Sequence, residues 1–277
     1  MAEEARVTRD PISFCAQPRF SDASLLVAFA EDAGGVASGV AGHLIDRLEG
    51  CSFAEIQPDG FFPLGGVAVR DNVAQFPEDR FYSLSREDLA LFSGSEPQID
   101  RFGFLQRVLD VAEHYCKVVD LYTVSGIMSS VAHTAPRSIL AVFNQPELQR
   151  RLRSYDLDNM TWEGQPALNS FLLWAARRRE IPALSLWTTV PFYMASVGDP
   201  ASRRKVLEFL DARFDLGLDF SEIDGETARL NERLATLRSR SSEVDNLIEK
   251  LEVGMALSQE EGTKLVGEVT EFLRQEE

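Results

Sequence analysis

Residues 24–50, SLLVAFAEDAGGVASGVAGHLIDRLEG, determine the fold class that the sequence predicts. The apolar run Ser24–Ala30 is short and uninterrupted, which is typical of a strand buried on both faces of a parallel sheet. The turn EDAGG follows, and apolar residues then recur at helical spacing until Gly50. The stretch therefore predicts a strand–turn–helix unit.

The same unit recurs along the chain as far as residue 219. We expect further strands at 51–57, 88–94, 118–126, 138–143 and 183–190, a hairpin within 61–75, and helices at 102–115, 146–154, 166–178 and 201–214. Strands that alternate with helices of this length predict an α/β fold, here a three-layer α/β/α sandwich with a mainly parallel central sheet. Residues 1–20 are polar and are expected to form an N-terminal arm, so the α/β domain would span residues 21–219.

The pattern changes after Gly217, where apolar residues recur every seven positions. The repeat consists of Ile223, Leu230, Leu237, Val244 and Leu251, with Leu234, Ile248 and Met255 at complementary positions. This heptad pattern, followed by a second amphipathic stretch at Thr263–Arg274, predicts a coiled-coil-like helical hairpin over residues 220–277. The pattern leaves open whether the apolar stripe pairs within one chain or between chains.

Charge and cysteine content exclude several classes of protein. The 277 residues carry a formal net charge of -16, which a nucleic-acid backbone would repel, so no nucleic-acid partner is expected. Cys15, Cys51 and Cys116 lack metal-ligand or redox spacing, and isolated thiols fit a reducing, cytoplasmic location. The sequence contains neither a secretory h-region nor an apolar run of the ~18 residues that a membrane helix needs, so no membrane contact is expected.

The glycine-rich turn Glu31–Gly39 is the first candidate site. Free N–H groups at the start of a helix bind anions, so Asp32, Gly34 and Gly35 are candidate ligand-binding residues. The turn matches neither G-x-G-x-x-G nor a P-loop, and Asp32 carries negative charge itself. The alternative is that Asp32 caps the helix while the glycines allow tight packing.

A second candidate, Gly94 and Glu96 in the segment GSEP, follows another predicted strand, at the end where open α/β sheets bind ligands. Glu96 would act as an acid, base or hydrogen-bond acceptor, or else would only begin the next helix. A third group comprises His133 and Arg137, in a predicted loop over residues 124–138, and Tyr193. His133 and Arg137 suit an anionic ligand, although a lone histidine is more often structural. No nucleophile or metal-ligand spacing accompanies these residues, so catalytic residues stay unknown and no metal site or cofactor is expected.

The order of several motifs resembles that of the proteasome assembly chaperone family, in its bacterial and archaeal branch. The motifs are the EDAGG turn, G-x-E-P at Gly94–Pro97, H-T-x-P at His133–Pro136, G-x-P at Gly164–Pro166 and I-P-x-x-S-L-W-x-x-V-P-x-Y at Ile181–Tyr193. The resemblance implies a fold similar to purine nucleoside phosphorylases without their chemistry, and homo-oligomers, with trimers expected. It implies no catalytic residue.

The resemblance also implies a link to the proteasome in archaeal members, whose activator-like tails end in a hydrophobic–Tyr–any motif. This chain ends FLRQEE and lacks that motif, so docking through the tail end is not expected. Our leading hypothesis is a non-catalytic binding or assembly module that self-associates through the α/β domain and engages a partner through its C-terminal helices. The alternatives are an enzyme or sensor with a pocket at the strand ends, related by family description to ATP-grasp ligases, and a tail that only completes its own core.

Overall fold

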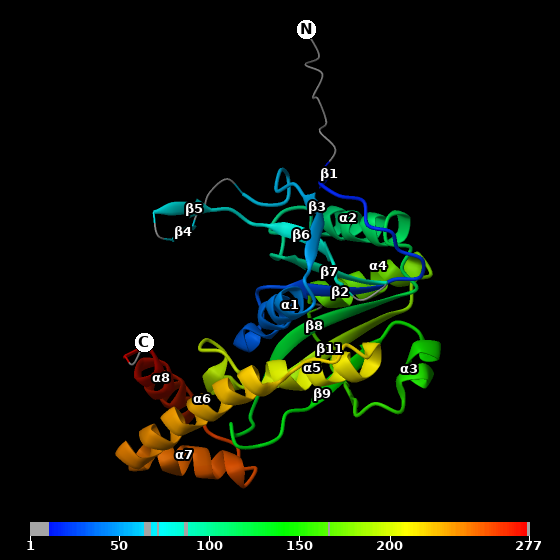
Figure 1. The fold of residues 1–277 in the computed structure, drawn as a ribbon. Helices are drawn as coiled ribbons and strands as arrows, with labels where there is room; N and C mark the ends of the chain where they lie inside the picture. The colour runs from blue at the N-terminus through cyan, green and yellow to red at the C-terminus, as the bar shows by residue number, and fades with distance from the viewer. Residues whose placement is uncertain (1–10, 64–67, 71, 86–87, 166, 276–277) are drawn as a thin grey trace.

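The computed structural model describes residues 11–63, 68–70, 72–85, 88–165 and 167–275. Parts of the expected arm (1–10) and hairpin (64–67 and 71), and Pro166, lie outside the described residues. The strands are β1 (Ile12–Phe14), β2 (Ser24–Phe29), β3 (Cys51–Ile56), β4 (Ala68–Arg70), β5 (Val73–Gln75), β6 (Asp79–Ser83), β7 (Leu89–Gly94), β8 (Asp120–Ser129), β9 (Ile139–Phe143), β10 (Asp158–Asn159) and β11 (Ala183–Pro191) (Figure 1). The helices are α1 (Val36–Arg47), α2 (Arg101–His114), α3 (Pro146–Leu152), α4 (Leu168–Arg178), α5 (Pro200–Phe214), α6 (Ser221–Arg240), α7 (Ser242–Glu252) and α8 (Gln259–Gln275), with 3-10 turns η1 (Ala33–Gly35) and η2 (Phe192–Met194).

Nine strands form one mixed sheet in the order β1-β3-β6-β7-β2-β8-β11-β9-β10. The four central strands β7, β2, β8 and β11 run parallel to one another. Antiparallel pairs flank them, with β6 against β7 on one side and β9 against β11 on the other. The predicted α/β fold is therefore confirmed, with parallel pairing concentrated in the centre of the sheet.

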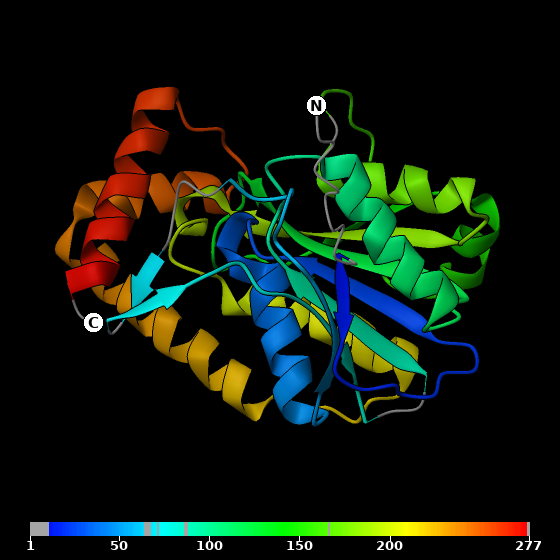
Figure 2. The same ribbon diagram turned by 90° about the horizontal axis from the view of Figure 1, so that it is seen from above.

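Helices cover both faces of the sheet, as Figure 2 shows from above. The apolar core on one face includes residues of α2 and α4, and the core on the other face includes residues of α1, α3 and α5. Every residue of β2 is buried, because this strand lies between two parallel neighbours and beneath helices on both faces. The uninterrupted apolar run in the sequence has this cause.

Three features differ from the sequence-based expectation. Ile12–Phe14, within the expected arm, pairs with β3 at the edge of the sheet, and β6 was not predicted at all. The strand β8 continues to Ser129, so the loop predicted at 124–138 starts only after that residue. The hairpin expected within 61–75, in contrast, agrees with the structure, where β4 and β5 pair antiparallel with each other.

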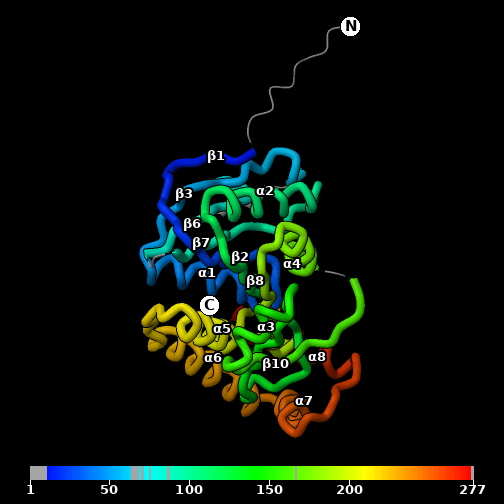
Figure 3. The backbone as a smooth tube through the Cα atoms, turned by 90° about the vertical axis from the view of Figure 1, so that its right-hand side faces the viewer, coloured from blue at the N-terminus to red at the C-terminus, as the bar shows by residue number. Residues whose placement is uncertain are grey.

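The C-terminal segment contains three helices instead of the predicted pair. Ser241 interrupts the long predicted helix because its backbone is extended (φ -130°, ψ 102°), and its hydroxyl then accepts the N–H of Val244 at 3.3 Å to cap α7. In Figure 3, α7 and α8 lie beyond α5, on the side of the molecule away from α2. The predicted C-terminal helices are thus confirmed, and their connection differs from a simple hairpin.

The heptad stripe is buried within this single chain. Leu234, Ile248 and Leu251 pack in one apolar cluster with Leu265 and Val269 of α8. The same cluster includes Tyr193 and Met194 of η2, so the C-terminal helices pack against the α/β domain as well as against one another. Met255, at the end of the repeat, remains 54% exposed.

Candidate functional site

Asp32 follows the carboxyl end of β2, beside the neighbouring parallel strand β8. Its Oδ2 atom accepts the N–H of Gly126 in β8 at 2.6 Å and the N–H of Ala37 in α1 at 3.0 Å. Open α/β sheets commonly bind ligands at the carboxyl ends of their strands, which is where Asp32 lies. Through these two hydrogen bonds the Asp32 carboxylate connects the start of α1 to the strand β8.

The glycines around Asp32 allow this close packing. A Cβ atom on Gly126 would lie 2.0 Å from the carbonyl oxygen of Ala33. Gly34 and Gly35 both have positive φ, and the N–H of Gly34 donates to the carbonyl of Ala195 at 2.8 Å. These contacts are those expected if Asp32 caps the helix, which is one of the two interpretations that the sequence left open.

Burial raises the pKa of the Asp32 carboxyl to about 6, although the N–H groups of Gly126 and Ala37 favour the charged form and partly offset the shift. The Oδ1 atom is buried and has no hydrogen-bond partner within the described part of the chain. One oxygen of the carboxylate, Oδ2, is therefore hydrogen-bonded, whereas the other, Oδ1, is buried without such a bond in the described part of the chain.

Gly94 and Glu96 lie beside a buried acid that sequence reasoning missed. Asp79, at the start of β6, is fully buried, and its Oδ1 accepts the N–H of Ser95 at 2.8 Å. A Cβ on Gly94 would lie 2.3 Å from this oxygen, so the glycine makes room for the carboxyl. The N–H of Glu96 donates to Oε2 of Glu31 at 2.7 Å, which connects the ends of β7 and β2.

This corner of the sheet disfavours negative charge. Burial raises the pKa of the Asp79 carboxyl to about 7, and the nearby carboxylate of Glu31 raises it further. Burial also raises the pKa of Glu96, while the guanidinium of Arg101 lowers it. Oδ2 of Asp79 has no partner among the residues that the structure describes. No signal in the sequence singles out Asp79, because it lies between polar residues.

His133 and Tyr193, which the sequence assigned to one candidate site, lie next to each other. Their polar atoms form hydrogen bonds with each other. The hydroxyl of Tyr193 accepts the backbone N–H of His133 at 2.6 Å and lies 2.9 Å from Nδ1 of the same residue. Burial lowers the pKa of His133 to about 4, and the charges of Arg238 and Arg137 lower it further. The imidazole is therefore neutral at neutral pH, and its Nδ1 atom shares a hydrogen bond with the Tyr193 hydroxyl.

Arg137 forms a buried ion pair with Asp199, the residue that precedes α5. Nε donates to Oδ2 at 2.7 Å, and the two side chains are 3% and 1% exposed. The remaining N–H groups of Arg137 donate to the carbonyls of Ala132, His133 and Ala135. The guanidinium thus fixes the shape of the 132–137 loop and has few donors left for a ligand.

The 132–137 loop also supports the C-terminal helices. Thr134 donates to Oε1 of Glu252 at 2.9 Å, and the same carboxylate forms an ion pair with Arg238 at 2.7 Å. Arg238 in turn bonds Asp245 at 2.7 Å, so α6, α7 and the loop form one connected polar layer over the apolar cluster. His133, Arg137 and Tyr193 are thus part of the base on which the C-terminal helices pack.

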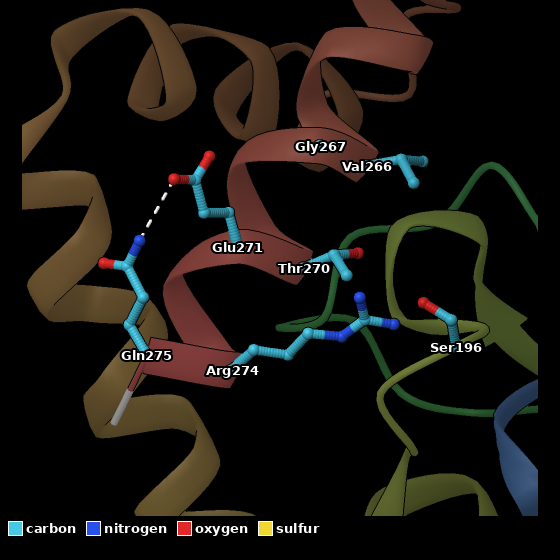
Figure 4. A pocket seen from close by; sticks show the side chains of 7 residues that line it. All are labelled: Ser196, Val266, Gly267, Thr270, Glu271, Arg274 and Gln275. Carbon is cyan, nitrogen blue, oxygen red and sulfur yellow. Dashed lines mark hydrogen bonds between the residues drawn. The ribbon is translucent and has the colours of Figure 1, made fainter. Parts of the chain in front are cut away.

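Two cavities in the described part of the chain are lined by side chains other than these candidates. A groove of about 530 Å³ separates α8 from the segment after η2, and Figure 4 shows Arg274 reaching from α8 towards Ser196 across it. A smaller pocket of about 290 Å³, between α4 and the sheet, contains Trp162 and Trp187. Within the described residues, no three His, Cys, Asp or Glu side chains converge as a metal-ligand set. None of the helices in that part of the chain has the length and apolar character needed to cross a bilayer.

Solved structures with this fold include three informative neighbours. The chain is similar to a PAC2 family protein from Streptomyces avermitilis, with 25% identity and a TM-score of 0.66 over 75% of this chain and 92% of that one. It is similar to a Mycobacterium tuberculosis proteasome-assembly chaperone homologue, with 19% identity and a TM-score of 0.68 over 77% and 94% of the two chains. It is also similar to Pyrococcus furiosus PbaB, an archaeal proteasome activator, with 20% identity and a TM-score of 0.70 over 82% and 98%.

No curated protein matches the chain. The model of the PAC2 family matches residues 26–238, which is most of the chain and includes the α/β domain and the helix α6. This match agrees with the resemblance that the ordered motifs indicated. The chain belongs to the PAC2 family.

Proposed function

We propose that the protein is a non-catalytic assembly module that self-associates through its α/β domain and binds a protein partner through its C-terminal helices. The observation that carries this proposal is an apolar surface on the α2–α4 layer. Phe102 and Trp174 are 51% and 47% exposed and contact each other, with ring centroids 5.9 Å apart. Phe171 is also exposed on the same layer. Exposed aromatic groups of this kind are typical of protein interfaces.

The bonding of the candidate site residues supports a binding role over a catalytic one. Asp32 and Arg137 are held by backbone groups, and His133 is neutral and bonded to Tyr193. Acid–base catalysis needs a titrating group with access to a substrate, and these groups are committed to internal contacts. The solved neighbours described as a proteasome-assembly chaperone homologue and a proteasome activator add support for an assembly role.

The C-terminal helices offer a second surface, at the connection between α7 and α8. Val253 and Met255 are 72% and 54% exposed there, whereas the apolar side of the same helices is buried against the domain. We expect this exposed tip, together with the groove along α8, to contact the partner (Figure 4).

Light scattering tests self-association. The wild-type mass is expected near three times the 30.9 kDa of one chain, and Phe102→Ser combined with Phe171→Ser is expected to reduce it towards one chain. Val253→Ser, an exposed apolar change on the C-terminal tip, serves as the matched control and should leave the mass unchanged. A wild-type monomer, or an aromatic double variant with the wild-type mass, would refute the proposed self-association.

Point substitutions test the partner surface better than truncation does. Removing residues 222–277 would expose Ala132, Tyr193 and Met194, so a truncated chain would fail for reasons unrelated to binding. Pull-downs from native lysate should instead compare the full chain with Val253→Ser plus Met255→Ser. Loss of a specific co-purified protein only in the tip variant supports the proposal, and an unchanged set of captured proteins contradicts it.

A further inference from the structure

The pocket between α4 and the sheet has a floor that the strand register defines. Trp187 of β11 pairs with Ser125 of β8, and Thr189 pairs with Ile127. On the other side of β11, Ser185 pairs with Val142 of β9. Residues two apart on a strand, and residues paired across strands, point to the same face. Trp187, Ile127 and Val142 therefore project together from the face that α2 and α4 cover.

This floor is left open because α4 is too short to cover it. Eleven residues give α4 a length of about 16 Å, whereas the nine residues of β11 span about 30 Å. The chain leaves α4 and enters the start of β11 after a short turn, so the helix covers mainly the first half of the strand (Figure 1). Trp187 lies near the end of that coverage and is only partly buried.

The segment before α4 provides the outer wall. It places Trp162 and Gln165 at the pocket, and α4 adds Ser170 from its first turns. The Trp162 indole packs against its own segment. The close approach is visible at Gly164, where a Cβ atom would lie 2.6 Å from the ring. The ring is 57% exposed, so it borders the cavity without being buried in the protein core.

We propose that this two-tryptophan pocket binds a small, uncharged, flat aromatic molecule of one or two fused rings. The pocket volume of about 290 Å³ is at the lower end of the ~300–1,000 Å³ usual for ligand pockets. This small volume limits the ligand to one or two fused rings. One indole in the floor and one in the outer wall favour an aromatic ring through offset or edge contacts. The lining contains no charged side chain, so a charged ligand would lose hydration without compensation. The Gln165 amide and the Ser170 hydroxyl supply the directional hydrogen bonds.

Fluorine NMR with 5-fluoroindole as the probe tests the pocket on the full chain. We expect saturable binding to the wild type, about tenfold weaker binding to Trp162→Ala, and none to Ser170→Phe, whose ring would fill the cavity. Phe76→Ala is the control, since it removes a 65% exposed aromatic ring that lies outside both the pocket and the α2–α4 surface, and it should keep the wild-type affinity. Both pocket substitutions are at exposed positions, so circular dichroism should report an unchanged fold.

Several results would overturn the inference. The absence of saturable binding to the wild type, or equal affinities for the Trp162→Ala and Phe76→Ala variants, would show that the pocket is not the binding site. Binding of 5-fluoroindole-3-carboxylate as tight as that of the neutral probe would refute the chemical class. A change of oligomeric mass in Trp162→Ala, measured by light scattering without any probe binding to the wild type, would assign the pocket to contacts between chains.

Discussion

Asp79→Asn is expected to stabilise the protein at alkaline pH and to have little effect at acidic pH. The carboxyl is fully buried, and burial raises its pKa from the ordinary 3.8 to about 7. Between these two values the folded protein retains a proton that the unfolded chain has released. Stability therefore falls as pH rises through this window, and the cost is complete above the folded pKa.

The size of the effect follows from the shift. A difference of about three pKa units corresponds to about 4 kcal/mol at pH 8, which is an upper limit because local relaxation reduces the cost. In the wild type, Asp79 accepts the N–H of Ser95 at 2.8 Å. Asparagine retains an oxygen that can accept this hydrogen bond, and it carries no charge. The new amide N–H2 group would take the place of Oδ2, which has no hydrogen-bond partner among the described residues whether or not the carboxyl is protonated. We expect a net gain of about 2–4 kcal/mol at pH 8.

Urea unfolding of the wild type and Asp79→Asn, followed by circular dichroism at pH 4.5 and pH 8, measures this gain. Asp88→Asn is the control of opposite sign, because Asp88 accepts the N–H and hydroxyl of Ser21, which lower its pKa. Its charged form contributes stability above pH 3.8, so its substitution should destabilise at pH 8. An equal change at both pH values for Asp79→Asn, or a loss at pH 8, would refute the reasoning.

Four further substitutions test the packing of the candidate site and of the C-terminal helices. Asp199→Asn breaks the buried pair with its arginine and should lower the free energy of unfolding by about 3–5 kcal/mol in urea titrations. Gly126→Ala places a methyl group 2.0 Å from the oxygen of Ala33 and should lower the melting temperature, whereas Gly42→Ala, with open space around it in α1, should raise the free energy of unfolding by about 0.5–1 kcal/mol. Leu265→Ala should cost about 2–5 kcal/mol and increase amide exchange in α8 before the sheet, because Leu265 is fully buried in the C-terminal apolar cluster.

The fold could be predicted where one physical constraint dominated the local sequence. Burial on both faces produces the apolar run of β2, and a covered helix face produces the spacing in α1. The edge strand β1 and the inner strand β6 gave no such signal, since both are short and only partly buried. Ser241 shows a different limit. A serine in a heptad can continue a helix or cap a new one, and the choice depends on the tertiary contacts of α7.

The heptad stripe shows why sequence could not decide what the tail does. An apolar stripe is equally well buried by a second chain, by a return helix or by a neighbouring domain. Here η2 of the α/β domain provides part of the cover, through Tyr193 and Met194. Tyr193 was a candidate ligand residue for the same reason, because an aromatic hydroxyl at a strand end suits a pocket and a packed interface equally.

The candidate residues illustrate how chemistry-bearing side chains gather for structural reasons. The ends of parallel strands leave unpaired N–H groups, and Asp32 satisfies one of them at Gly126. The loop after β8 needs its carbonyls bonded, and Arg137 does this while Asp199 neutralises its charge. Polar residues at these positions are therefore needed for folding alone. The surfaces free to bind another molecule lie elsewhere, where the covering helix is too short or the exposed side chain is aromatic, as at Trp187 and Trp174. The proposed self-association surface and the proposed two-tryptophan pocket both lie on the α2–α4 side of the sheet, and the substitutions at Phe102 and Phe171 on the one and at Trp162 on the other are designed to separate them.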